Sequence, residues 1–129
     1  MKRSDALQPL SREHHTALTL AKACERAVQS GAAEQVNTAC QRVIRAFASE
    51  LEPHFLVEEQ SLLPLLKEAE TQPLIRRTLA DHQQMRALLE GLQQDDAAAL
   101  ERFGKCLSDH VRFEERELFP ALEKVMSGD

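Results

Sequence analysis

One short pattern occurs twice in this chain. Residues 54–66 read HFLVEEQSLLPLL and residues 110–122 read HVRFEERELFPAL, so a His, a pair of Glu, a Leu, a Pro and a closing Leu keep their places. A His and a Glu four residues apart lie on one face of an α-helix, one turn from each other. Imidazole and carboxylate are both ligands of divalent metals. The repeat therefore predicts two helices that bring His and Glu to one shared site.

Length and charge restrict what else the chain can be. Its 129 residues suit a single domain, 1–129. The net charge is −5 and the basic residues form no block, which argues against nucleic acid or an anionic membrane as a partner. No apolar run approaches the ~20 residues that a membrane span needs. The cysteines are three in number and scattered, and no signal peptide precedes them, so we expect a cytoplasmic protein.

Apolar residues at steps of three and four predict four helices. The first opens at Pro9 or Ser11 and closes at Gly31, and the second runs from Ala33 to about residues 67–70 with a kink at Pro53. The third and fourth cover residues 72–93 and 96–125, and residues up to about Leu7 are expected to be frayed. Short connections between four helices predict an all-α fold, an antiparallel up-down four-helix bundle over about residues 10–125.

Helix lengths test whether these helices can share one metal level. The distances from the predicted site to the helix ends agree within a few ångströms for the later connections. The first hairpin agrees less well, because ~24 Å of helix after His14 must match ~32 Å before His54. We expect the kink at Pro53, or a longer first loop, to absorb about one helical turn.

Four of the five histidines lie one per helix on the apolar face, and two glutamates share that position. Buried His and Glu are costly unless they pair or bind a metal. Four imidazoles and two carboxylates suit two metal ions bridged by carboxylates better than they suit one. The predicted metal ligands are His14, His54, Glu58, His82, His110 and Glu114.

Two roles are open for each of the residues next to these ligands. His15 lies one step off the apolar face, so we interpret it as a surface residue or a partner of a ligand. Glu59 and Glu115 lie ~100° around the helix from the ligand glutamates, which favours hydrogen bonding to a ligand or to another helix over metal binding. Asp81 and Asp109 each precede a His and either orient it or face solvent.

At these residues the chain resembles the hemerythrin-like, or HHE cation-binding, family. The resemblance covers about residues 10–125 and rests on Glu13-His14, Asp81-His82 and the two copies of HxxxEExxLxP. It implies a four-helix bundle with a non-haem di-iron centre, whose two irons are bridged by the glutamates and by a solvent oxo or hydroxo group. The implied ligands are the six residues named above.

The chain departs from the oxygen-carrying hemerythrins at one position. Those proteins have a second His four residues after the His of the third helix, where this chain has Arg86. Fewer histidines imply open positions on iron, and the resemblance is then to the branch linked to nitric oxide response, iron–sulfur repair, iron sensing or peroxide chemistry. Arg86 either stabilises an anionic small ligand or pairs with Glu90, its neighbour one turn on.

Three functional hypotheses follow. The first is a di-iron binding protein that interacts with O2, NO or peroxide, or senses iron, in a stress response. The second is a di-iron enzyme, such as a ferroxidase, a peroxidase or an NO reductase. The third is an interaction module with no metal or with structural zinc. The sequence leaves the oligomeric state open.

Overall fold

The computed structural model describes residues 3–127, and all regular structure in that range is helical. Four long helical stretches follow one another along the chain. They are α1 (Gln8–Ser30); α2 (Ala33–Ala46), η1 (Phe47–Leu51), α3 (Glu52–Val57), η2 (Glu58–Leu62) and η3 (Leu63–Leu65); α4 (Gln72–Gln93), preceded by the short η4 (Ala69–Thr71); and α5 (Ala97–Phe113), η5 (Glu114–Leu118) and α6 (Phe119–Met126).

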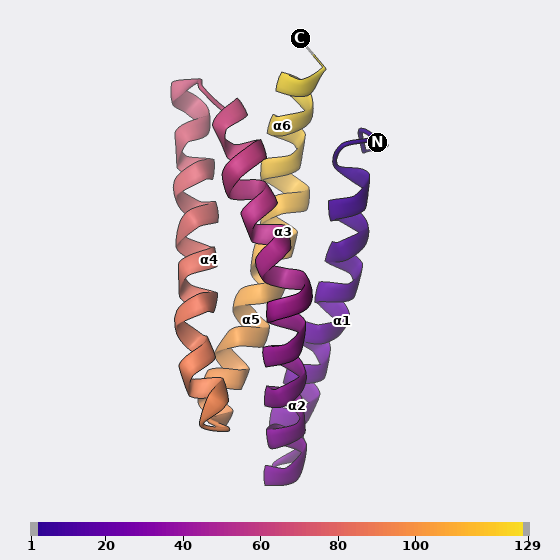
Figure 1. The fold of residues 1–129 in the computed structure, drawn as a ribbon, viewed down its shortest axis with the longest axis vertical. Helices are drawn as coiled ribbons and strands as arrows, with labels where there is room; N and C mark the ends of the chain where they lie inside the picture. The colour runs from indigo at the N-terminus through magenta and orange to yellow at the C-terminus, as the bar shows by residue number, and fades with distance from the viewer. Residues whose placement is uncertain (1–2, 128–129) are drawn as a thin grey trace.

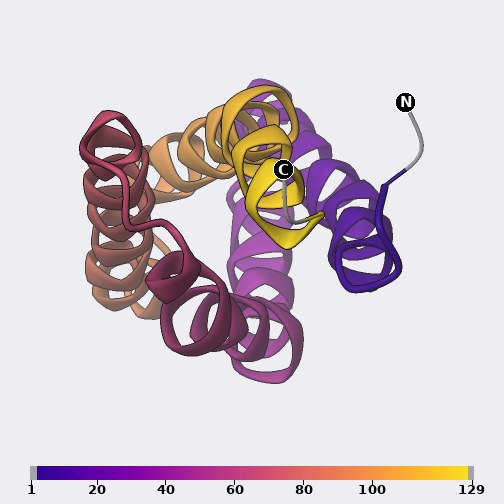
Figure 2. The same ribbon diagram turned by 90° about the horizontal axis from the view of Figure 1, so that it is seen from above.

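The four stretches form a bundle around one axis. The two ends of the chain lie at the same end of the bundle, and the connections from α1 to α2 and from α4 to α5 lie at the other (Figure 1). Seen from above, the stretches follow the order α1, α2–α3, α4 and α5–α6 around a closed circuit (Figure 2). The predicted all-α class and four-helix arrangement are confirmed for the described residues. None of the described helices is long and apolar enough to cross a bilayer.

Local sequence signals explain where α1 ends and where α5 begins. Gly31 ends α1 in a left-handed conformation with φ of 66°, which costs glycine little because it has no Cβ. The side chain of Asp96 accepts a hydrogen bond of 2.9 Å from the backbone N–H of Ala98 and so caps the start of α5. The predicted end of the first helix at Gly31 is confirmed.

Three π-helical segments interrupt the stretches, and each ends two residues before a proline. Their closing hydrogen bonds run from the N–H of Glu52, Leu63 and Phe119 to carbonyls five residues earlier. Pro53, Pro64 and Pro120 follow directly. Proline offers no N–H and clashes with the carbonyl four residues earlier, so a wider turn accommodates it. A π-helical turn, η1, lies just before Pro53, where the sequence predicts a kink.

Each π turn adds one residue, and this shifts the buried face downstream. A step of three from Leu62 would place Leu65 on the apolar face, but its side chain is 38% exposed, whereas Leu66 is buried. After η5 the same shift buries Leu122 rather than Ala121. The helical part of this stretch also ends at Leu65, before the predicted 67–70, because Leu63–Leu65 already tightens into a 3₁₀ turn around Pro64.

The N-terminal segment is more ordered than expected. Leu7 was predicted to be frayed, but it is fully buried in an apolar cluster with Leu10 and Phe119. Arg3 donates hydrogen bonds to Glu115 and Glu123, which fastens the segment to η5 and α6. Residues 1 and 2 lie outside the described range, so the prediction is corrected only for the residues after them.

Two apolar clusters fill the bundle and leave a polar level between them. One cluster includes Cys24, Met85, Leu100 and Phe103, and the other lies around Leu7 at the end of the bundle that carries the termini. Their side chains exclude water from both sides of the polar level. The buried His and Glu residues occupy this level.

Candidate metal centre

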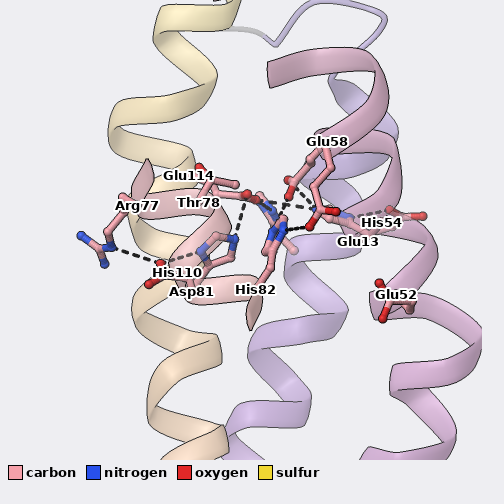
Figure 3. A network of polar contacts seen from close by, with 12 residues as sticks. Glu13, Glu52, His54, Glu58, Arg77, Thr78, Asp81, His82, His110 and Glu114 are labelled. Atoms are coloured by element: carbon pink, nitrogen blue, oxygen red, sulfur yellow. Dashed lines mark hydrogen bonds and ion pairs between the residues drawn. The ribbon is translucent and has the colours of Figure 1, made fainter. Parts of the chain in front are cut away.

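Six buried polar side chains meet between the two apolar clusters. Each helical stretch supplies one His, and the second and fourth stretches supply one Glu each (Figure 3). All six are at most 6% exposed; they are His14, His54, Glu58, His82, His110 and Glu114. The structure thus brings together every residue that the sequence predicted as a ligand.

Each carboxylate lies between two imidazoles, with one oxygen toward each. The four contacts are Glu58 Oε2 to His54 Nε2 (2.9 Å), Glu58 Oε1 to His82 Nε2 (2.9 Å), Glu114 Oε1 to His14 Nε2 (2.6 Å) and Glu114 Oε2 to His110 Nε2 (2.9 Å). The first and third have the geometry of hydrogen bonds. The other two do not, which leaves four buried atoms without a hydrogen-bond partner: Glu58 Oε1, His82 Nε2, His110 Nε2 and Glu114 Oε2.

Buried donor atoms that converge without bonding one another fit a metal ion. Unpaired buried polar atoms are rare in folded proteins, and they require an explanation such as a bound ion. The ligand atoms form two groups, and the atoms within each group lie within 4.8 Å of one another. One group is His14, His54, Glu58 and Glu114, and the other is Glu58, His82, His110 and Glu114. Both glutamates belong to both groups. Imidazole and carboxylate together suit iron, zinc and other divalent first-row metals.

The other ring nitrogen of each of these four histidines contacts a second carboxylate on a neighbouring stretch. The distances from Nδ1 are 2.6 Å from His14 to Glu115, 2.7 Å from His54 to Glu13, 2.7 Å from His82 to Glu59 and 2.7 Å from His110 to Asp81. An ionised carboxylate only accepts, so Nδ1 carries a proton and donates, and Nε2 is the nitrogen directed into the centre of the site. Carboxylate–histidine pairs of this kind orient metal ligands and raise their basicity.

These four pairs close a ring around the bundle. The His of α1 contacts a carboxylate of η5, and the His of α5 contacts one of α4. The His of α4 contacts a carboxylate of η2, and the His of α3 contacts one of α1. Every stretch therefore gives one His and one carboxylate to the ring. We refer to this set of contacts as the carboxylate ring.

Three of the ring carboxylates are held in turn by an arginine. Arg3 lies 3.1 Å from Glu115, Arg77 lies 3.1 Å from Asp81, and Arg86 lies 3.0 Å from Glu59. Among residues 3–127 no cation other than His54 contacts Glu13, whose side chain is 55% exposed. The ring is therefore supported unevenly.

The charges of the site change the pKa values of its histidines. Burial alone would lower the pKa of His54, but the nearby carboxylates of Glu114 and Glu58 outweigh burial and raise the pKa to about 11. Burial also opposes the charge of His110, yet Glu114 and Asp81 raise its pKa to about 9. Both imidazoles are therefore positively charged, with a proton on each nitrogen, at neutral pH in the metal-free protein. Metal binding must displace one proton from each.

The two glutamates respond in opposite directions. Burial and the nearby charge of Glu114 raise the pKa of Glu58. Burial works against ionisation of Glu114 as well, but the charge of His110 and the nearby imidazoles of His14 and His54 hold its pKa well below the usual value. Two carboxylates this close thus have different affinities for protons, and an added cation would favour the ionised form of both.

A cavity of about 130 Å³ leads from the surface to the site. Glu13, Arg42 and Glu50 line its outer part, where they are exposed, and His14, His54 and Glu114 are among the residues at its inner part. Apolar side chains make up most of the remaining wall: Ala17, Leu20, Ala46, Leu51, Phe55, Leu107 and Val111. The cavity has room for several water molecules, which indicates access for a small molecule.

Some neighbouring residues lie elsewhere than predicted. His15 is exposed, and its ring makes no hydrogen bond or ion pair within residues 3–127, so the interpretation as a partner of a ligand is wrong. Asp81 contacts His110 on the next helix and not His82 beside it. Asp109 faces solvent near Arg112. Arg86 pairs with glutamates of the second stretch, so its predicted pairing with Glu90 is also wrong.

Sequence reasoning did not identify Glu13 as the partner of His54, nor Arg3 and Arg77 as partners of ring carboxylates. A signal for the first was present. Each ring carboxylate is adjacent in sequence to a ligand, in the pairs 13–14, 58–59, 81–82 and 114–115. Arg77 stands four residues before Asp81 on α4, a spacing that places both on one face of the helix, whereas nothing local identifies Arg3, which approaches from the N-terminal segment.

The tandem His14-His15 provides a matched test of the ligand set. We expect His14→Ala to lower metal affinity by at least the ~10–100-fold typical of residues that orient ligands. We expect His15→Ala to leave affinity unchanged, because that ring faces solvent. Titration of both variants with a divalent metal under anaerobic conditions measures the difference. Loss of binding in His15→Ala alone would contradict the assignment.

Comparison with known protein families agrees with this geometry. One family matches the chain over residues 5–122, the Hemerythrin HHE cation binding domain. No significant match was found among curated proteins or among solved structures. The match spans all four helical stretches and all six buried ligand candidates. The chain therefore belongs to the Hemerythrin HHE cation binding domain family.

Proposed function

We propose that the protein binds two non-haem iron ions and that the centre interacts with O2, NO or peroxide, or senses iron. The observation that carries this proposal is the pair of four-ligand groups that share Glu58 and Glu114. His14 and His54 would hold one ion, His82 would hold the other with His110, and both carboxylates would bridge them. The family match supports cation binding, and the His-rich donor set favours iron over magnesium or calcium.

The protein supplies few ligands for each ion. Two imidazoles and a share of two carboxylates give four protein ligands, which leaves positions for a small exogenous ligand. When bound, iron supplies one-electron chemistry and affinity for small ligands at such positions. The cavity beside His14 and His54 offers a route to them, and its size favours molecules of a few atoms. Glu13 and the other ring carboxylates keep the protons on Nδ1 and hold the imidazoles in place.

Other features are consistent with the remaining parts of the proposal. The order of the stretches in Figure 1 supports an antiparallel up-down bundle that forms one domain. Cys24, Cys40 and Cys106 are free thiols, which fits a reducing compartment such as the cytoplasm. The proposed partner is a small diatomic molecule or peroxide. Nucleic acid is not proposed, because the net charge is −5.

Metal content tests the proposal directly. Anaerobic loading with Fe(II) followed by desalting is expected to leave two irons per chain, since two ligand groups are present. Oxidation should then produce near-ultraviolet charge-transfer absorption. A colourless protein with one ion or none would contradict the di-iron proposal. Zinc loading is the necessary comparison, because zinc binds such ligands more tightly than Fe(II) and would support a structural zinc module if iron failed to bind.

Reaction with small molecules distinguishes a binding protein from an enzyme. We expect NO to change the visible spectrum of the Fe(II) protein under anaerobic conditions and O2 to oxidise it rapidly. Consumption of peroxide or NO over many equivalents would indicate an enzyme. A single stoichiometric reaction would indicate binding or sensing, and a long-lived, reversible oxygenated form would indicate oxygen carriage.

A further inference from the structure

Arg86 joins α4 to the second helical stretch. It lies one turn after His82, and its side chain is 21% exposed. Nε lies 3.1 Å from both carboxylate oxygens of Glu52, and Nη2 lies 2.5 Å from one of them. Nη1 lies 3.0 Å from Glu59. All three nitrogens are therefore engaged by carboxylates, and none is directed at a ligand of the metal centre.

The contact with Glu59 continues to the metal site. Glu59 Oε2 is the oxygen that Arg86 contacts, and the same oxygen accepts the hydrogen bond of 2.7 Å from His82 Nδ1. A guanidinium therefore holds the carboxylate that holds the imidazole. Arginine suits this role because its planar fork fixes two carboxylates at defined angles.

Phe55 completes the enclosure of His82. Its ring stacks on the imidazole with centroids 3.9 Å apart and an interplanar angle of 10°. The Arg86 guanidinium lies 5.8 Å from the centroid of the same ring. His82 is fully buried, and its ring is thus fixed by Phe55 on one face and by Glu59 at Nδ1.

We propose that Arg86 is a positioning residue for the metal ligand His82, acting through Glu59 and anchored by Glu52. The inference rests on the proposed metal-binding function and deepens it. Loss of Arg86 frees Glu59 to adopt other rotamers, and His82 Nδ1 then loses a fixed acceptor. The resulting loss of ligand orientation weakens metal binding in the group that contains His82 and His110.

The test compares Arg86→Gln with Arg112→Gln. Arg112 is an exposed arginine whose carboxylate partner, Asp109, is also exposed, so its replacement controls for loss of a positive charge. In anaerobic metal titrations we expect Arg86→Gln to weaken binding of one of the two ions about tenfold, at the low end of the range for residues that orient ligands. We expect Arg112→Gln to match the unmodified protein. Equal affinities for all three would overturn the proposal.

A double variant tests whether the effect passes through Glu59. If Arg86 acts only through that carboxylate, Glu59→Gln combined with Arg86→Gln should bind metal no more weakly than Glu59→Gln alone. Arg86→Lys should recover only part of the affinity, because one ammonium cannot hold Glu52 and Glu59 as the guanidinium does. Additive losses, or full recovery with Lys, would show that Arg86 acts by charge or by general stability instead.

A metal-free measurement separates this inference from the proposed function. In protein labelled with ¹⁵N-histidine, the Nδ1 proton of His82 should exchange slowly with solvent, and Arg86→Gln should accelerate that exchange while the other three imidazoles keep theirs. Unchanged exchange would overturn the positioning role even if metal binds. Failure of the unmodified protein to take up metal, with the exchange result as expected, would instead reject the metal function and leave the positioning of His82 established.

Discussion

Replacing Glu114 with Gln should weaken binding of both metal ions, whereas replacing His54 with Ala should remove only one. The reason is the sharing of ligands. Glu114 belongs to both four-ligand groups and lies 2.6 Å from His14 and 2.9 Å from His110. His54 belongs to one group. We expect Glu114→Gln to lose at least about 100-fold in affinity for each ion, because direct ligands matter no less than the residues that orient them.

Metal-to-protein ratios after anaerobic loading measure this difference. The expected ratios are two for the unmodified protein, one for His54→Ala and below one for Glu114→Gln. Glu117→Gln is the matched control, because this exposed glutamate lies in the same π-helical segment, η5. Circular dichroism verifies that each variant keeps its helices. Equal ratios for His54→Ala and Glu114→Gln would mean that the six residues do not form two groups.

Metal-free and metal-loaded protein should respond oppositely to pH. In the metal-free protein, His54 and His110 have pKa values of about 11 and about 9, above the ordinary value of ~6.5. A group with a raised folded-state pKa stabilises the fold fully below its unfolded pKa and loses that contribution as pH rises through the folded pKa. The raised pKa of Glu58 acts in the same direction. Stability of the metal-free protein should therefore decline from about pH 6.5 upward.

In the metal-loaded protein, stability changes with pH in the opposite direction. The ligand imidazoles must be neutral, so metal binding lowers their pKa values, and the metal's contribution to stability is lost as pH falls. We expect the gap in Tm between the two forms to widen by at least about 5 °C from pH 5.5 to pH 8, which corresponds to about 1 kcal/mol in a domain of this size. Thermal melts of both forms across that range test this. Parallel curves would mean that metal and protons do not compete.

Sequence periodicity was sufficient to predict the four helices and the alignment of His and Glu on their inner faces. It failed after Pro64 and Pro120, because a 3.6-residue period does not anticipate an extra residue, whereas His54 and Glu58 after Pro53 are buried as predicted. The period alone places Leu65 in the core in place of Leu66. A rule that a proline inside a helical pattern follows a π turn would have predicted η1 before Pro53 and the register after Pro64.

The contacts around the ligands were harder to predict because they join different helices. Asp81 stands next to His82 in the sequence, yet it holds His110 on α5. Spacing along one helix specifies which face a side chain occupies, but not which neighbour meets it there. Arg86 shows the same limitation, since its partners, Glu52 and Glu59, precede it by about 30 residues and become adjacent only when α4 packs beside α3.

The carboxylate ring also determines which way the bundle turns. Apolar seams alone pack equally well whether successive helices follow one another clockwise or anticlockwise. The ring does not allow both. Glu13 lies ~100° around a right-handed helix from His14, so when His14 faces the bundle axis, Glu13 can face the neighbour on one side only. In this protein that neighbour carries His54. In a bundle of the opposite sense, Glu13 would face the fourth helix instead. His54 would then lose its hydrogen-bond acceptor. The residues of the candidate site therefore also encode the handedness of the fold.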